Sequence, residues 1–121
     1  MGITCTTLKS IRAGTVLGTT STEDKLPLDA TGVEVRFDVR LYTNGSVYVR
    51  FNNSSSTGAV TLYRSVDGVN AALLETTQVL TISNPMSATL DLTGIAYLHA
   101  RVTTAVSSEW CEVRVLAKVV Q

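Results

Sequence analysis

Few residues of this chain have the types and spacing that catalysis requires. A Ser-His-Asp or Cys-His site needs a base, and His99 is the only histidine in the sequence. His99 lies between Tyr97 and Arg101 in a segment of alternating polarity, where a surface position or a cross-strand hydrogen bond is the commoner role. Phosphate-binding loops and dinucleotide fingerprints are absent from the sequence. The sequence therefore predicts a protein that is not an enzyme, with no catalytic residues and no cofactor.

Metal ligation is equally unsupported by the residue spacing. Cys5, Cys111 and His99 are not spaced like the ligands of a zinc site. The stretch SVDGVN places Asp67 and Asn70 in a turn, but two oxygen ligands are too few for calcium, and Asp-Gly is ordinary turn chemistry. We therefore predict no metal site.

The two cysteines lie near opposite ends of the chain. Because the N-terminal stretch MGITCTTLKS lacks the apolar segment of an export signal, we favour buried free thiols for Cys5 and Cys111. A disulfide is the alternative, since the first and last strands of a β-sandwich often lie side by side.

Length and composition indicate one domain, residues 1–121, with a substantial core. Hydrophobic residues make up 45% of the 121 residues and charged residues 17%, which is typical of a globular protein. Ten basic and ten acidic residues give a net charge of zero, so nucleic acid is not the expected partner. No apolar run approaches the roughly 20 residues of a membrane-spanning helix, so no membrane partner is expected.

Apolar and polar residues alternate along most of the chain, while helical periodicity does not persist anywhere. Short alternating segments separated by turn residues predict an all-β fold, an antiparallel β-sandwich of the jelly-roll or immunoglobulin-like type with eight or nine strands and little or no helix. Segment 18–32 is predicted as a loop or extended arm, because Pro27 argues against a central strand. The predicted strands are 3–12, 33–42, 46–52, 58–65, 69–75, 78–83, 86–92, 96–104 and 109–120.

The same alternation predicts which side chains face the core. Three segments near the C-terminus each carry an apolar series on one parity, with polar residues on the other. The inward series are Met86, Ala88, Leu90 and Leu92, then Ala96, Leu98, Ala100 and Val102, and finally Cys111, Val113, Val115, Ala117 and Val119.

The stretch DVRLYTNGSVYVRF, residues 38–51, has the Asn-Gly signature of a β-hairpin. A two-residue turn would set the apolar face of one strand against the polar face of the other. A three-residue loop with Gly45 in the left-handed position instead pairs Phe37 with Phe51 and sets Asp38 opposite Arg50. We therefore predict an amphipathic hairpin in this register.

Aromatic residues outside the core suggest a contact surface. Five of them fall on the polar side of their strands: Tyr42, Tyr48, Tyr63, Tyr97 and Trp110. Tyrosine and tryptophan are enriched at protein interfaces. We therefore predict self-association through the outer face of the closing strand, at Trp110, Leu116 and Val120, with Tyr97 contributing from the preceding strand. The alternative is that the 18–32 arm folds over Trp110 within one chain.

Two stretches carry a resemblance to a known group of proteins. DLTGIAYLHARVTTAVSSEWCEVRVLAKV (91–119) and LYRSVDGVNAALL (62–74) resemble the closing hairpin and a strand-turn-strand unit of small β-sandwich virion proteins of tailed bacteriophages. The resemblance implies a capsid decoration (cement) protein that stabilises the phage head, or a related neck or tail component. It further implies a homo-oligomer, with a trimer as one arrangement, that binds the major capsid protein on the virion after synthesis in the host cytoplasm.

A binding module of another class is the competing hypothesis. A carbohydrate-binding module or an adhesin-like β-sandwich would use Tyr42, Tyr48 or Tyr63 as a platform for sugar rings. The low aromatic content, 6% of the chain, favours the virion protein instead.

Overall fold

The chain folds as an antiparallel β-sandwich, as the alternation predicts. The computed structural model describes residues 3–8, 11–12, 25–67, 69–70, 72–73 and 79–120. Every regular element within these ranges is a β-strand, and every strand pair is antiparallel. No helix in this part of the chain is long and apolar enough to cross a membrane.

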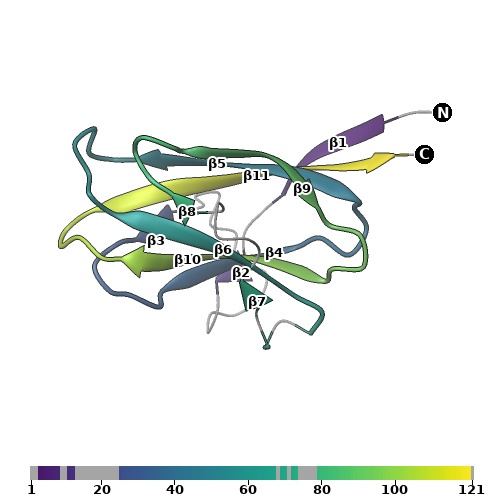
Figure 1. Cartoon of the computed structure of the whole chain (residues 1–121), viewed down its shortest axis with the longest axis horizontal. Helices are drawn as coiled ribbons and strands as arrows, with labels where there is room; N and C mark the ends of the chain where they lie inside the picture. The colour runs from purple at the N-terminus through teal and green to yellow at the C-terminus, as the bar shows by residue number, and fades with distance from the viewer. Residues whose placement is uncertain are drawn as a thin grey trace.

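One layer, which we call sheet A, has five strands around the long closing strand. Its order is β1-β11-β5-β9, and the short β3 pairs with β11. The strands are β1 (Ile3–Leu8), β3 (Lys25–Pro27), β5 (Asn44–Phe51), β9 (Met86–Asp91) and β11 (Trp110–Val120). In Figure 1 sheet A forms the upper layer, with both chain ends at its right-hand side.

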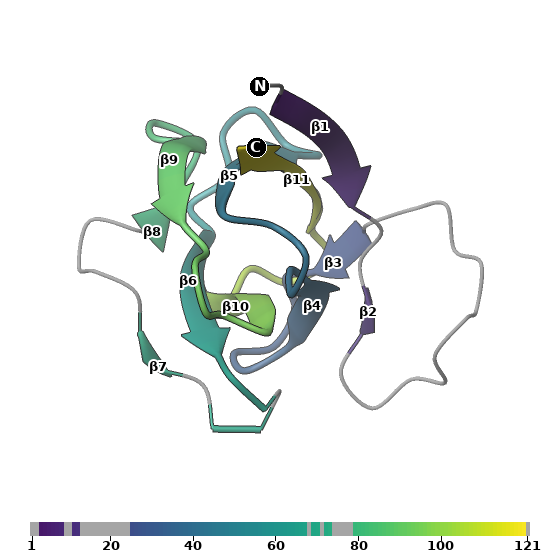
Figure 2. The ribbon, with the colours of Figure 1, turned by 90° about the vertical axis from the view of Figure 1, so that its right-hand side faces the viewer.

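The second layer, sheet B, has six strands with β10 at its centre. Its order is β2-β4-β10-β6-β7, and β8 pairs with β6. The strands are β2 (Ile11–Arg12), β4 (Glu34–Asp38), β6 (Ala59–Ser65), β7 (Ala72–Leu73), β8 (Val79–Leu80) and β10 (Tyr97–Thr104). Figure 2 looks along the sandwich and shows β11 and β5 on the opposite side of the core from β10, β4 and β6.

A single hydrophobic core fills the space between the sheets, because each strand sends alternate side chains inward. Most predicted inward residues of β10 and β11 are confirmed. Their buried members are Leu98, Ala100, Val102, Cys111, Val113, Val115 and Ala117. Phe37 from sheet B and Phe51 from sheet A are buried in the same cluster. Ala96 is half-buried, and the side chain of Val119 lies outside the described residues.

The predicted hairpin at residues 38–51 is wrong. β4 pairs with β10 and β2, whereas β5 pairs with β11 and β9, so the two strands lie in different sheets. Asp38 is therefore not opposite Arg50; it accepts a hydrogen bond from Arg40 Nε at 2.9 Å within the connection. Leu41, which the predicted register would place opposite Val47 on the buried face of the hairpin, is 80% exposed. The connection crosses from one layer to the other instead of turning back.

The amphipathic pattern was correctly identified but assigned to the wrong geometry. Two strands facing each other across a core bury the same alternate residues as two strands lying side by side, so parity cannot separate the arrangements. Gly45 is accordingly inside β5 and not in a left-handed turn position. A Cβ atom at Gly45 would lie 2.9 Å from Leu92 Cδ1, so close packing explains the glycine.

The predicted inward series at the start of β9 is also wrong. Between Gly45–Leu90 and Val47–Ser87, β5 advances two residues while β9 advances three. The extra residue is a β-bulge, which reverses the phase of the strand. Leu90 consequently points inward as predicted, but Ser87 is buried while Met86 and Ala88 are exposed.

The N-terminal third differs from the prediction in two places. The predicted strand 3–12 is two strands, since β1 pairs with β11 in sheet A and β2 pairs with β4 in sheet B. The predicted arm 18–32 contains β3, which pairs with β11 through Trp110 and Pro27. Pro27 is compatible with this position because β3 pairs with a single neighbour and lies at the edge of the sheet.

Candidate functional site

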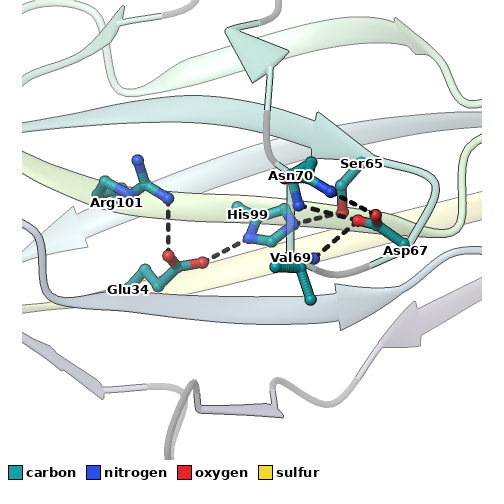
Figure 3. Close-up of polar contacts among 7 residues, drawn as sticks. All are labelled: Glu34, Ser65, Asp67, Val69, Asn70, His99 and Arg101. Carbon is teal, nitrogen blue, oxygen red and sulfur yellow. Dashed lines mark hydrogen bonds and ion pairs between the residues drawn. The ribbon is translucent and has the colours of Figure 1, made fainter.

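The outer face of sheet B carries a row of polar side chains that meet at His99. In β10, His99 lies directly between Arg36 of β4 and Tyr63 of β6. Its ring reaches diagonally to a residue of each neighbouring strand, Glu34 on one side and Ser65 on the other (Figure 3). Three adjacent strands are thus tied together by one histidine.

The contacts of this row, which we call the His99 row, run from Ser65 through His99 and Glu34 to Arg101. His99 Nε2 lies 2.7 Å from Ser65 Oγ. His99 Nδ1 contacts Glu34 Oε2, and Arg101 Nη2 donates to Glu34 Oε1 at 2.8 Å. The Arg101 guanidinium also lies 4.5 Å from the centre of the Tyr63 ring, which brings an aromatic side chain beside the row.

The Glu34 carboxyl group is ionised at neutral pH. Burial raises the pKa of Glu34, but the hydrogen bonds from His99 and Arg101, together with the positive charge of Arg101, more than offset that cost and hold the pKa below its usual value. Because an ionised carboxylate only accepts hydrogen bonds, His99 Nδ1 must carry a proton. His99 Nε2 then accepts the Ser65 hydroxyl in the neutral ring, or donates to Ser65 Oγ in the charged ring.

The order serine, histidine, carboxylate is that of a nucleophile, its base and the group that orients the base. Such a site works only if a substrate carbonyl can reach the serine oxygen. Ser65 is 4% exposed and His99 is 1% exposed, so a substrate cannot reach either residue in this structure. The predicted cross-strand hydrogen bond of His99 is therefore confirmed, and the predicted surface position is wrong.

The structure also places the other residues with potential chemistry. Among the described residues, no group of three or more histidine, cysteine or acidic side chains could hold a metal ion. Cys111 is a free thiol in the core, so the alternative of a disulfide to Cys5 is wrong. Burial raises the pKa of Cys111 to about 12. The side chain of Cys5 lies outside the described residues.

Asp67 and Asn70 form the turn expected from their sequence. The Asp67 carboxylate accepts hydrogen bonds from the backbone N–H groups of Val69 and Asn70 at 2.8 and 2.9 Å and from Asn70 Nδ2 at 2.8 Å (Figure 3). These donors hold the pKa of Asp67 below its usual value. The carboxylate oxygens are used to close the turn, as is common for aspartate.

The residues predicted to form one interface lie on two different faces. Trp110 and Leu116 are outward residues of β11 in sheet A, whereas Tyr97 is on β10 in sheet B. The sandwich therefore separates Tyr97 from the other two. The side chain of Val120 lies outside the described residues. Lys25 of β3 lies 4.6 Å from the centre of the Trp110 ring, so part of the predicted arm does cover Trp110 within the chain.

Sheet A presents a second candidate site on its outer face. Tyr48, Met86 and Leu116 are 45%, 54% and 40% exposed, and Tyr48 and Met86 are direct cross-strand partners. Together with neighbouring residues they line an open hollow of about 250 Å³. Large exposed apolar side chains gathered on one face are typical of a binding surface. We call this surface the open face of sheet A.

Comparison with known proteins identifies a fold. No family model matches the sequence, and no curated protein gives a significant match. Among solved structures, the crystal structure of SPBc2 prophage-derived protein YomS matches 98% of this chain and 96% of that chain, with a TM-score of 0.62 and 14% sequence identity. The two chains share a fold. At this level of identity the match concerns the architecture of the backbone alone.

Sequence reasoning missed both candidate sites in part. Glu34 and Ser65 were not associated with His99, because they lie on strands whose neighbours only the topology reveals. Met86 was assigned to the core because the bulge in β9 leaves no clear signature in the alternation. One signal was available: Tyr48 and Leu116 both lie opposite the apolar parity of their strands, and both are indeed exposed.

Proposed function

We propose that this chain is a non-enzymatic structural protein of a bacteriophage particle, and specifically a capsid decoration (cement) protein that self-associates and stabilises the head. The observation that carries the proposal is the fold shared with a prophage-derived protein over 98% of the chain. The resemblance of segments 62–74 and 91–119 to small virion proteins supports the same assignment. Fold alone does not imply function, so the surfaces of the molecule must supply the binding.

The burial of the His99 row supports a role without catalysis. Ser65 and His99 share their hydrogen bond beneath the protein surface, where it ties β6 to β10. Glu34 extends the tie to β4. A row of this kind contributes to the rigidity of sheet B, which suits a protein that must hold its shape on a particle.

One end of the sandwich carries side chains suited to contact with a shell. Leu41, Val66 and Val69 are 80%, 71% and 79% exposed. They belong to the β4–β5 connection and to the turn after β6, which Figure 1 shows at the right-hand end of the molecule. Scattered exposed apolar residues are normal, but three at one loop end can anchor a partner. We propose that this loop end contacts the major capsid protein.

Co-sedimentation with capsids tests the proposal. The wild-type protein, mixed with heads assembled from the major capsid protein of the same phage, should sediment with the heads at a fixed ratio. The double variant Leu41→Ser/Val69→Ser should bind about tenfold more weakly, because loss of apolar anchors weakens binding by this order. Thr57→Ser, at an exposed position in the β5–β6 connection at the opposite end of both strands, is the matched control. A wild-type protein that stays in the supernatant would contradict the proposal.

The competing functions give different outcomes in the same preparation. A neck or tail component would sediment with purified necks or tails and not with heads. A carbohydrate-binding module would bind a glycan array and depend on its tyrosines. The structure gives this alternative little support, because Tyr48 lies on sheet A and Tyr63 on sheet B. Tyr42 is partly buried against the core, so the three rings do not form one platform.

A further inference from the structure

The outward residues of β11 form a sequence that is complementary to its own reverse. Those with described side chains are, in order, Trp110, Glu112, Arg114 and Leu116, so the acid and the base lie between two apolar side chains. A half-turn about Val113 exchanges the two apolar residues and exchanges the acid with the base. A second copy of the same strand, lying antiparallel across this face, would therefore meet opposite charges at the centre and apolar groups at the ends.

We propose that the open face of sheet A is a two-fold contact between two copies of this chain, centred on Val113. This inference rests on the self-association contained in the proposed function. In this arrangement each Arg114 faces Glu112 of the second copy, and each Leu116 faces the edge of Trp110 of the second copy, whose ring is half-buried beside Lys25 of its own chain. Isologous contacts of this kind are the commonest in soluble oligomers.

The charges on this face favour a second copy. Glu112 is paired within its own chain to Arg50, with 3.2 Å between Arg50 Nη2 and Glu112 Oε2. A carboxylate accepts several hydrogen bonds, so Glu112 can take another cation. Among the described residues no ion pair involves Arg114, which is exposed next to Glu112 on the same strand face. The face therefore offers the donor and the acceptor that two copies would exchange.

The side chains around Glu112 and Arg114 provide further area that such a contact would bury. Tyr48 lies beside Arg114 in the register, and Arg50 lies beside Glu112. The half-turn therefore brings the Tyr48 ring against Arg50 of the second copy, which is a favourable cation–aromatic arrangement. Met86, 54% exposed, extends the surface to β9. Tyrosine, methionine and arginine are the residue types enriched at protein interfaces.

A pair of charge-swapped variants tests the two-fold arrangement directly. The first variant is Arg114→Glu, which sets two acids against each other at both central contacts. The second is Arg50→Glu/Glu112→Arg, which keeps the pair within the chain but sets two arginines against each other between copies. Mixed together, the two variants place an acid opposite a base at both contacts.

Sedimentation equilibrium supplies the measurement. Each variant alone should self-associate at least about tenfold more weakly than the wild type, because like charges are brought together twice in a two-fold contact. The equimolar mixture should recover a heterodimer. Leu41→Ser, exposed at the loop end, should leave self-association unchanged, and circular dichroism should show that all variants are folded. If the swapped variants do not fold, Leu116→Ser replaces them and should weaken self-association.

Three outcomes would overturn the inference: a monomeric wild type, variants that self-associate normally, or weakened variants that do not combine on mixing. The co-sedimentation experiment separates these from a failure of the proposed function. A monomeric protein that binds heads would keep the function and remove the two-fold contact. A dimer that restores on mixing but does not bind heads would keep the contact and remove the function.

Discussion

The two outer faces of this sandwich are built from the same kind of alternating strand, yet their outward side chains differ in burial and in hydrogen bonding. On sheet B, Glu34, Ser65 and His99 are joined by hydrogen bonds across three strands and are largely buried. On sheet A, Tyr48 and Leu116 are exposed, and Arg114 lies directly opposite Tyr48. An outward position can therefore serve stability or binding, depending on its neighbours.

The largest expected effect is on sheet B. His99→Ala removes a buried ring and leaves Ser65 and Glu34 without their shared partner, which should lower the free energy of unfolding by about 3 kcal/mol. Urea denaturation with an unchanged m-value would measure the loss. Tyr48→Ser on sheet A is the control. Equal losses in the two variants would break the contrast between the faces.

A smaller effect is expected from Glu34→Gln, which keeps the shape of the side chain but removes its charge. The change should cost about 1–2 kcal/mol at neutral pH, the range for hydrogen bonds to a charged group. The folded pKa of Glu34 is depressed below the ordinary value of 4.5, so the stability it contributes is present above that value and is lost as pH falls through the folded pKa.

Denaturation midpoints at several pH values would check this dependence. The difference between wild type and Glu34→Gln should be full at neutral pH and should shrink in acid, as pH falls through the depressed pKa of Glu34. Other carboxyl groups, including Asp38 and Asp67, also have depressed pKa values, so the comparison must be between the two proteins and not the acid sensitivity of the wild type alone. A difference that is constant with pH would show that the charge of Glu34 is unimportant.

The smallest expected effect on stability belongs to sheet A. Tyr48→Ser and Leu116→Ser should change the free energy of unfolding of the monomer by less than about 0.5 kcal/mol, since exposed side chains away from buried features contribute little. Both should nevertheless weaken self-association. Denaturation at the lowest measurable protein concentration separates the two quantities. A large loss of monomer stability would show that this face belongs to the fold rather than to a contact.

Much of the fold could be predicted from the sequence because burial imposes a period of two on every strand. The inward positions of β10 and β11, from Leu98 to Val115, follow directly from that pattern. The type of fold follows as well, since several short alternating segments leave few other solutions. For the candidate sites the pattern identified the outward residues Tyr48, His99 and Leu116 but not their neighbours.

Only the tertiary structure decided which strands are neighbours. Backbone hydrogen bonds are nearly the same for any partner strand, so nothing in residues 38–51 distinguishes a hairpin from a crossing between two sheets. For the same reason the sequence could not reveal that Tyr97 and Trp110 lie on different sheets. Nor could it reveal that Glu34, His99 and Ser65 are in contact. The alternation thus determined what each side chain needs, a core or an outer face, because that requirement is local. The packing of the layers determined which other residues satisfy it, because those residues come from distant parts of the chain.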